Sequence, residues 1–296
     1  MNISNHRRTR DRVITVLTYL VMTFVLLLPF ALFIGLAAKS ELLFRDNSLG
    51  QLLFSSQWRP SSGEFGFKPF IVGSLYVTLI AMLISAPICF LSAIHITQYA
   101  PRKAAKIVVT AIDILAGIPS VVYGVWGMVF VVPWLGRIAA SLGIQSNGYS
   151  ILAGGVVLSI MVIPFILNIL MEIYRTIPKE LTEVSLSLGA TRWETIRDVL
   201  NRKALPGILA AFGFGFARAF GETMAVLMVV GNVVMIPSGL FDPGYPLPAL
   251  IANSFGELGS IPEIESALMF AALILLVVVL VFNATLRWLI IRVEKY

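Results

Sequence analysis

Long apolar runs separated by short polar segments dominate the pattern of this chain. Six runs have roughly the 20 residues or more that a helix needs to cross a bilayer. They cover residues 13–38, 70–99, 107–135, 149–174, 205–236 and 267–291. The pattern therefore predicts an all-α integral membrane protein with six transmembrane helices and with both termini on one side. The first run lacks a small-residue cleavage site, so we expect a retained helix rather than a signal peptide.

The composition supports this class. Hydrophobic residues make up 58% of the chain and charged residues 13%, against roughly 45–50% and 25% in soluble domains. The net charge of +6 comes from basic residues spread over short connections. Without a dense basic tract, no nucleic-acid partner is expected, and the expected surroundings are the lipid bilayer. A single cysteine, Cys89, excludes a disulfide framework within the chain.

The distribution of Lys and Arg predicts the orientation, because these residues gather on the cytoplasmic side of membrane proteins. Sixteen lie in the N-terminal tail, the second-to-third and fourth-to-fifth connections and the C-terminus, against five in the opposite connections. Both termini and the connection at about residues 176–204 are therefore expected in the cytoplasm. The outward segment 39–69 suits either a docking surface for an extracytoplasmic partner or a simple covering loop.

The connection at about 176–204 is the longest polar interruption, and its pattern predicts two short helices. Pro178 suits a first helical turn, and Gly189 can close the first helix in a left-handed conformation. Thr191 and Glu194 form a Thr-x-x-Glu capping box that opens the second helix. This segment is expected to contact a cytoplasmic partner.

Two oppositely charged residues, Arg218 and Glu222, fall deep within the fifth run, one helical turn apart. A charge at the bilayer centre costs about 2.5–3.5 kcal/mol on insertion scales, so both need a reason to be there. A stripe of small residues at four-residue spacing runs beside them and would admit a neighbouring helix closely: Gly213, Ala217, Gly221 and Ala225.

Two interpretations of the charged residues stay open. They form an internal ion pair that stabilises packing, or they line an ion pathway. Arginine suits an oxyanion because its planar fork of donors remains charged. Glu222 would compete for Arg218 and keep the anion affinity low, which favours passage over storage.

The motifs of enzymes are missing from the sequence. It contains no Gly-x-x-x-x-Gly-Lys-Ser/Thr loop for ATP, no His-Glu-x-x-His metal motif and no Gly-x-Ser-x-Gly nucleophile elbow. Neither a catalytic residue nor a metal site is predicted. We expect no enzymatic activity and no cofactor on this chain, so energy for uphill transport would come from a partner.

Three stretches carry a family resemblance. Residues 183–191, EVSLSLGAT, resemble the E-A-A-x-x-x-G loop of binding-protein-dependent ABC importer permeases. Residues 118–127, IPSVVYGVWG, and 217–225, ARAFGETMA, look like the PstC-type permease of phosphate importers, as does the outward segment around Trp58 and 63–69. The resemblance covers most of the chain, from about residue 52 to the last span.

The resemblance implies a type I ABC importer permease fold in a bacterial cell (inner) membrane. It divides the chain into residues 1–69 (cytoplasmic tail, first helix, outward loop), 70–291 (the transmembrane domain) and 292–296 (cytoplasmic C-terminus). Implied partners are a homologous second permease (PstA type), a dimer of ATPase subunits (PstB type) that binds ATP and Mg²⁺, and an extracytoplasmic phosphate-binding protein (PstS type).

The resemblance also implies roles for particular residues. The expected substrate pathway comprises Arg218, Glu222 and Thr223, and the loop that couples to the ATPase comprises Glu183, Gly189, Ala190, Thr191, Arg192 and Trp193. The expected function is a pore-forming permease subunit for inorganic phosphate. Two alternatives stay open: a permease for another oxyanion (sulfate, molybdate, tungstate) and a membrane scaffold that senses phosphate.

Overall fold

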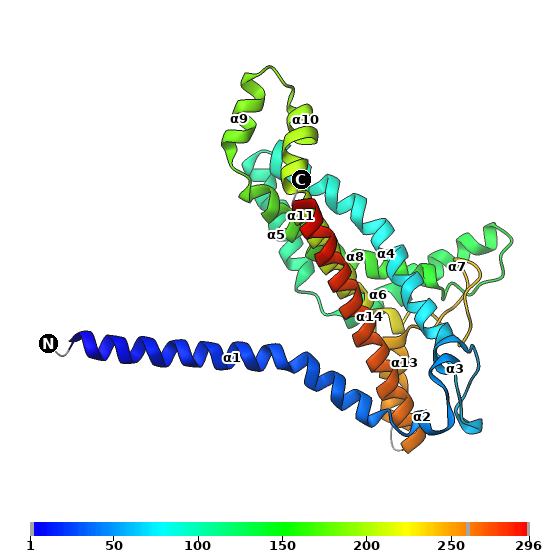
Figure 1. Ribbon diagram of the computed structural model, residues 1–296. Coiled ribbons are helices and arrows are strands. Elements are labelled where there is room, and N and C mark those ends of the chain that lie inside the picture. The colour runs from blue at the N-terminus through cyan, green and yellow to red at the C-terminus, as the bar shows by residue number, and fades with distance from the viewer. Residues whose placement is uncertain (1–2, 259–260, 295–296) are drawn as a thin grey trace.

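The computed structural model describes residues 3–258 and 261–294, and these form helices joined by short connections (Figure 1). The α-helices are α1 (Ile3–Lys39), α2 (Leu43–Asp46), α3 (Leu49–Phe54), α4 (Lys68–Ile94), α5 (Arg102–Ala116), α6 (Ser120–Trp126), α7 (Val132–Ser141), α8 (Ile151–Thr176), α9 (Lys179–Ser187), α10 (Arg192–Glu194), α11 (Asn201–Phe220), α12 (Met224–Leu227), α13 (Leu247–Leu258) and α14 (Pro262–Glu294).

Three short π-helical segments continue these helices, and one small sheet interrupts them. The π segments are η2 (His95–Tyr99), η3 (Gly127–Val131) and η4 (Thr195–Leu200). The strands β1 (Trp58–Arg59) and β2 (Glu64–Phe65) pair antiparallel around the 3-10 turn η1 (Pro60–Ser62). The prediction of an all-α protein is thus confirmed, with one two-stranded hairpin added.

Five helical stretches are long and apolar enough to cross a membrane within the described residues. They are Arg10–Lys39, Lys68–Tyr99, Ser120–Ser141, Ile151–Thr176 and Pro262–Val293. The predicted fifth run, 205–236, is not among them. The count of six transmembrane helices is therefore not reproduced by continuous helices.

The fifth run departs from the prediction at both ends. α10, η4 and α11 follow one another without a break, so the second short helix is continuous with the predicted span. α11 then ends at Phe220, and the short α12 begins at Met224. Because Gly221 and the polar Glu222 and Thr223 interrupt the helix, the small-residue stripe does not lie on one continuous helix.

The third run is also divided. α5 ends at Ala116, and the chain turns through Gly117, Ile118 and Pro119 before α6 begins. Proline lacks an amide hydrogen and disfavours helical backbone in the residue before it, so it separates the two helices. α7 then projects away from the other helices (Figure 1).

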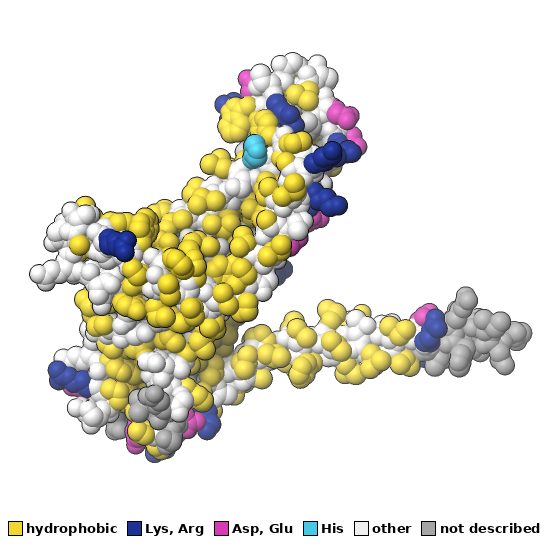
Figure 2. All heavy atoms as spheres, turned by 180° about the vertical axis from the view of Figure 1, so that it is seen from behind, with side chains coloured by type: hydrophobic (Ala, Val, Ile, Leu, Met, Phe, Trp, Pro, Cys, Tyr) yellow, Lys and Arg dark blue, Asp and Glu magenta, His cyan; other side chains and the backbone are white. Residues whose placement is uncertain are grey.

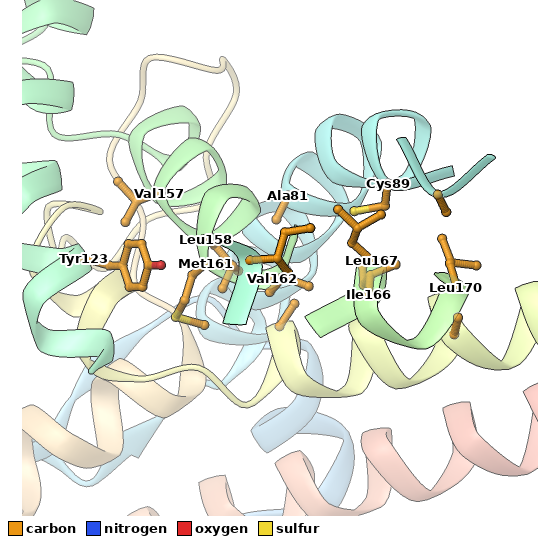
Figure 3. Close-up of a cluster of buried hydrophobic side chains, with 14 of the residues drawn as sticks. Ala81, Cys89, Tyr123, Val157, Leu158, Met161, Val162, Ile166, Leu167 and Leu170 are labelled. Carbon is orange, nitrogen blue, oxygen red and sulfur yellow. The ribbon is translucent and has the colours of Figure 1, made fainter. Parts of the chain in front are cut away.

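The main core lies between α4 and α8, which pack along each other more extensively than any other pair of helices. Ala81 and Cys89 on α4 face Val162 and Ile166 on α8, as Figure 3 shows. Small side chains on α4 admit this close approach. A second core, around Phe67 and Phe70, joins α4 to the outward segment and to α13 and α14.

The outer surface is divided by polarity. Charged side chains gather toward two ends of the molecule, and an apolar band lies between them (Figure 2). α9 and α10 lie at one end, together with the C-terminal end of α14, and α2 and α3 lie at the other (Figure 1). This arrangement suits a protein that spans a bilayer.

Candidate functional site

Arg218 lies in the last turn of α11, level with the middle of α8. Its guanidinium carbon is 5.6 Å from the ring centroid of Phe165 on α8, and the side chain is otherwise exposed. The aromatic face attracts the cation. Among the described residues no carboxylate lies within ion-pairing distance of Arg218. Arg218 and Glu222 therefore form no ion pair in the described part of the chain, and the packing interpretation has no direct contact between them to support it.

Glu222 and Thr223 occupy the gap between α11 and α12. The Glu222 carboxylate accepts a hydrogen bond from the backbone nitrogen of Ala225 at 3.4 Å, and the Thr223 hydroxyl donates to the carbonyl of Gly221 at 3.4 Å. Both side chains are half-buried. The expectation that Arg218 and Glu222 lie one helical turn apart is corrected here, because the helix ends at Phe220.

A further polar pair lies near this place and was missed by the sequence reasoning. The amide nitrogen of Asn168 on α8 donates to a carboxylate oxygen of Asp113 on α5 at 3.2 Å. Asn168 follows Phe165 by three residues, so both lie on one face of α8. Arg218, Phe165, Asn168 and Asp113 therefore form a row that leads along α8 toward α9. A lone Asn inside an apolar run was the available signal.

The two-helix unit, defined as α9, α10 and η4, agrees with its prediction. Gly189 closes α9 with a φ of 87°, in the left-handed region. The Thr191 hydroxyl accepts from the backbone nitrogen of Glu194 at 3.3 Å, and the Glu194 carboxylate accepts from that of Thr191 at 2.7 Å. Two hydrogen bonds lower the pKa of the Glu194 carboxyl. The larger effect comes from the backbone nitrogen of Thr191, and the second comes from the Thr191 hydroxyl. The capping box is confirmed.

Apolar side chains lie uncovered on the two-helix unit. Leu188 is 82% exposed, Val184 58% and Trp193 51%. Glu183 and Thr191 are also exposed, and Ala190 is half-buried. Exposed apolar side chains surrounded by polar ones are typical of a surface that binds another protein. Within the unit, the hydroxyls of Ser185 and Thr195 are buried and 2.9 Å apart, which ties α9 to η4.

Arg192, one of the residues predicted to couple to an ATPase, contacts the end of α4. Its guanidinium carbon lies 4.9 Å from the ring centroid of Tyr99, and a guanidinium nitrogen donates to the carbonyl oxygen of Gln98. Both partners belong to η2, at the end of α4. These contacts bridge 94 positions of sequence, so no local pattern could have predicted them.

Long apolar helices with an exposed, partly apolar two-helix unit at one end indicate a multi-pass membrane protein with a docking surface for a partner. The chain belongs to the family of binding-protein-dependent transport system inner membrane components, which it matches over residues 85–295. It is therefore a multi-pass membrane component of such a system. The family consists of permease subunits, so ATP hydrolysis belongs to another chain.

The chain is also similar to proteins that are named as permeases. The chain is 38% identical over 262 residues to a probable ABC transporter permease protein, YqgH, of Bacillus subtilis, covering 87% of this chain and 83% of the relative. It is 35% identical over 257 residues to the phosphate transport system permease protein PstC of Xylella fastidiosa, covering 82% and 79%. A probable PstC of Methanocaldococcus jannaschii is 34% identical over 276 residues, covering 88% and 87%.

Solved structures show the same fold. A chain of a bacterial alginate ABC transporter superposes with a TM-score of 0.64 at 18% identity, covering 95% of this chain and 96% of that one. A chain of the MetNI methionine ABC transporter superposes with a TM-score of 0.57 at 21% identity, covering 80% and 99%. The expected type I ABC importer permease fold is confirmed.

Proposed function

We propose that this chain is the pore-forming permease subunit of an ATP-driven importer that carries inorganic phosphate across the cytoplasmic membrane. The names of the PstC relatives support phosphate as the substrate. The observation that carries the proposal is the placement of Arg218, a cation at the end of an apolar helix that stacks on Phe165 and has no ion-pair partner among the described residues.

The chemistry of Arg218 suits a tetrahedral oxyanion. A guanidinium offers a planar fork of donors that matches two oxygens of phosphate. Glu222 and Thr223 follow Arg218 by four and five residues, and they would supply one carboxylate and one hydroxyl at the edge of the proposed route. A carboxylate beside the route weakens anion binding and so permits release.

The proposed partners follow from the two ends of the molecule. The exposed apolar residues of the two-helix unit, Val184, Leu188 and Trp193, would dock on a dimer of ATPase subunits of the PstB type. A second permease of the PstA type would complete the pore. The opposite end, with its aromatic group around Trp58, would receive phosphate from a binding protein of the PstS type. Both termini would lie in the cytoplasm.

The test is phosphate uptake and phosphate-dependent ATP hydrolysis by the complete importer in vesicles, with Arg218→Ala compared to the native chain. We expect uptake to fall by about tenfold or more, because one lost charge-assisted hydrogen bond is worth about 1.5–3 kcal/mol, while the ATPase subunits still co-purify. Arg218→Lys, which keeps the charge but not the fork, should retain an intermediate rate.

Three outcomes would contradict the proposal. Loss of co-purified ATPase in Arg218→Ala would return the residue to a packing role. Uptake of sulfate, molybdate or tungstate in preference to phosphate would identify a permease for another oxyanion. Zero flux for the native chain with every partner present would favour a scaffold that senses phosphate.

A further inference from the structure

Three side chains stack where α4 meets the two-helix unit. The rings of His95 and Tyr99, both in η2, have centroids 6.2 Å apart and planes 20° apart. The Arg192 guanidinium covers the Tyr99 ring, with its carbon 4.9 Å from the centroid, and it donates to the carbonyl of Gln98. One arginine thus joins the end of α4 to the unit by two different kinds of contact.

The backbone around this contact is irregular on both sides. Tyr99 belongs to the π segment η2, and Arg192 opens the helix that continues into the π segment η4. π segments inside helices are rare and frequently mark functional sites. The regular α-helical ladder is therefore interrupted at both elements that the arginine connects.

α4 extends through the whole molecule from this contact. It begins at Lys68, next to the aromatic group at the opposite end, where the Trp58 ring lies 5.3 Å from that of Phe67 and 4.9 Å from that of Phe70. Along its length it packs on α8. A displacement applied to the η2 end of α4 reaches the aromatic end, because helices in a close-packed core transmit strain.

The two-helix unit has its chain connections to α8 and α11 alone. We propose that Arg192 is a positioning residue that carries displacement of the unit into α4, so that ATPase movement reaches the outward end. Arg192 thus belongs to the joint with α4 rather than to the ATPase docking face. The inference rests on the proposed function, since it needs an ATPase that moves the unit.

The test measures how far a phosphate-loaded binding protein stimulates ATP hydrolysis by the complete importer in vesicles. Arg192→Ala and Tyr99→Leu should each lower this stimulation by about threefold or more, in line with the strength of a cation–π contact. The double variant should be no worse than Arg192→Ala alone, because that substitution already removes the contact with the Tyr99 ring. Tyr99→Phe keeps the ring and should remain native.

A matched control lies in the same unit but makes its contact locally: Arg197, whose guanidinium bonds the neighbouring Asp198 at 2.8 Å. Arg197→Ala should leave the stimulation unchanged. Arg192→Lys keeps the charge without the flat guanidinium, so its stimulation should fall between those of the native chain and Arg192→Ala. Unchanged stimulation in Arg192→Ala, multiplied losses in the double variant, or loss of co-purified ATPase would each overturn the inference.

A second readout does not depend on the substrate. In a Cys89→Ala background that keeps Tyr99 and Arg192, Gln98→Cys and Trp193→Cys should be joined by a flexible bismaleimide equally well in the nucleotide-free complex and in one trapped with vanadate, because the contact of Arg192 with Tyr99 makes the two elements move together. A cross-link that disappears on trapping would overturn the inference. If the native complex shows no phosphate-stimulated hydrolysis, the proposed function fails, and this cross-link still decides whether the joint exists.

Discussion

Placing the charge of Arg218 in a membrane costs more free energy than its contact with Phe165 returns. Placing its charge in the middle of a membrane costs about 2.5–3.5 kcal/mol on insertion scales. The stacking on Phe165, at 5.6 Å, returns roughly 0.5–2 kcal/mol, depending on how dry the contact is. The stacking alone therefore does not offset the cost, and water or an anion beside the guanidinium would supply the rest. The energetics of this one residue therefore favour a pathway over a structural role.

Gly189 offers a test of the bend in the two-helix unit at the level of one residue. Its φ is 87°, and a Cβ at this position would meet nothing within 4 Å, so Gly189→Ala introduces backbone strain without a clash. The left-handed conformation costs an L-residue roughly 1–2 kcal/mol. We expect ATPase subunits to bind about tenfold more weakly in detergent titrations, since about 1.4 kcal/mol corresponds to tenfold.

Gly50 in α3 provides the control for that substitution. It also has open space around it, and its φ lies outside the left-handed region. Gly50→Ala should bind the ATPase subunits like the native chain. Equal binding by Gly189→Ala would mean that the bend is not held in the docked state.

At the scale of elements, the sequence correctly predicts the helix ends that are determined by residues within one turn. The capping box at Thr191 and the left-handed Gly189 follow from residues within one turn, and both were predicted correctly. The break after Phe220 was missed, because the apolar pattern continues through it into α12. The polar pair Glu222 and Thr223 directly after a glycine was the available signal.

Contacts between elements that lie far apart in the sequence were not predicted. The bond between Asn168 and Asp113 joins two helices, and Arg192 meets η2 across 94 positions. Periodicity and capping report on neighbours within about one turn, so they identify which residues are polar without stating which of them meet. Family resemblance predicted the fold correctly, whereas the contacts of each side chain became known only from the packing of the helices.

The close approach of α4 and α8 gives a prediction at the same scale. A Cβ on Gly155 would lie 2.4 Å from Cγ2 and 2.7 Å from Cβ of Ile80. Because a β-branched side chain is stiff at its Cβ, the helices must separate. We expect Gly155→Ala to destabilise the protein by about 1–3 kcal/mol, the usual cost of overpacking, and to lower the midpoint of thermal unfolding in detergent.

Gly35 in α1 is the matched position without neighbours, since nothing lies within 4 Å of its Cβ position. Gly35→Ala should leave the midpoint unchanged or raise it, because alanine favours a helix over glycine. An unfolding midpoint that is the same for both variants would show that α4 and α8 pack less closely than the distances at Gly155 indicate.

As a whole, the molecule has the surface of one part of a larger assembly. α1 extends away from the other helices, with the apolar window of its spanning stretch 0% buried (Figure 1). It is held at its end by contacts with α14, including an ion pair between Lys39 and Glu265 at 3.2 Å. Lipid tails are as apolar as leucine, so such a surface is stable within a bilayer.

The number and direction of the crossings can be tested on the whole chain by cysteine labelling in intact cells, in a Cys89→Ala background. Ser62→Cys and Leu240→Cys should react with a membrane-impermeant maleimide from outside, and Ser187→Cys only after permeabilisation. All three native side chains are exposed. Labelling of 62 and 187 from opposite sides requires an odd number of crossings between them, as α4, the α5–α7 segment and α8 provide.

The position at 240 decides whether α11 completes a crossing despite ending at Phe220. At about 1.5 Å per residue, the part of α11 from Leu205 to Arg218 covers about 20 Å of a hydrocarbon core about 30 Å thick, so α11 alone stops short of the far side. Labelling at 240 from outside would make it the exit of the fifth crossing and place Arg218 within the membrane. Labelling at 240 only after permeabilisation would mean that α11 does not cross, and Arg218 would then meet its anion at a surface rather than in a pore.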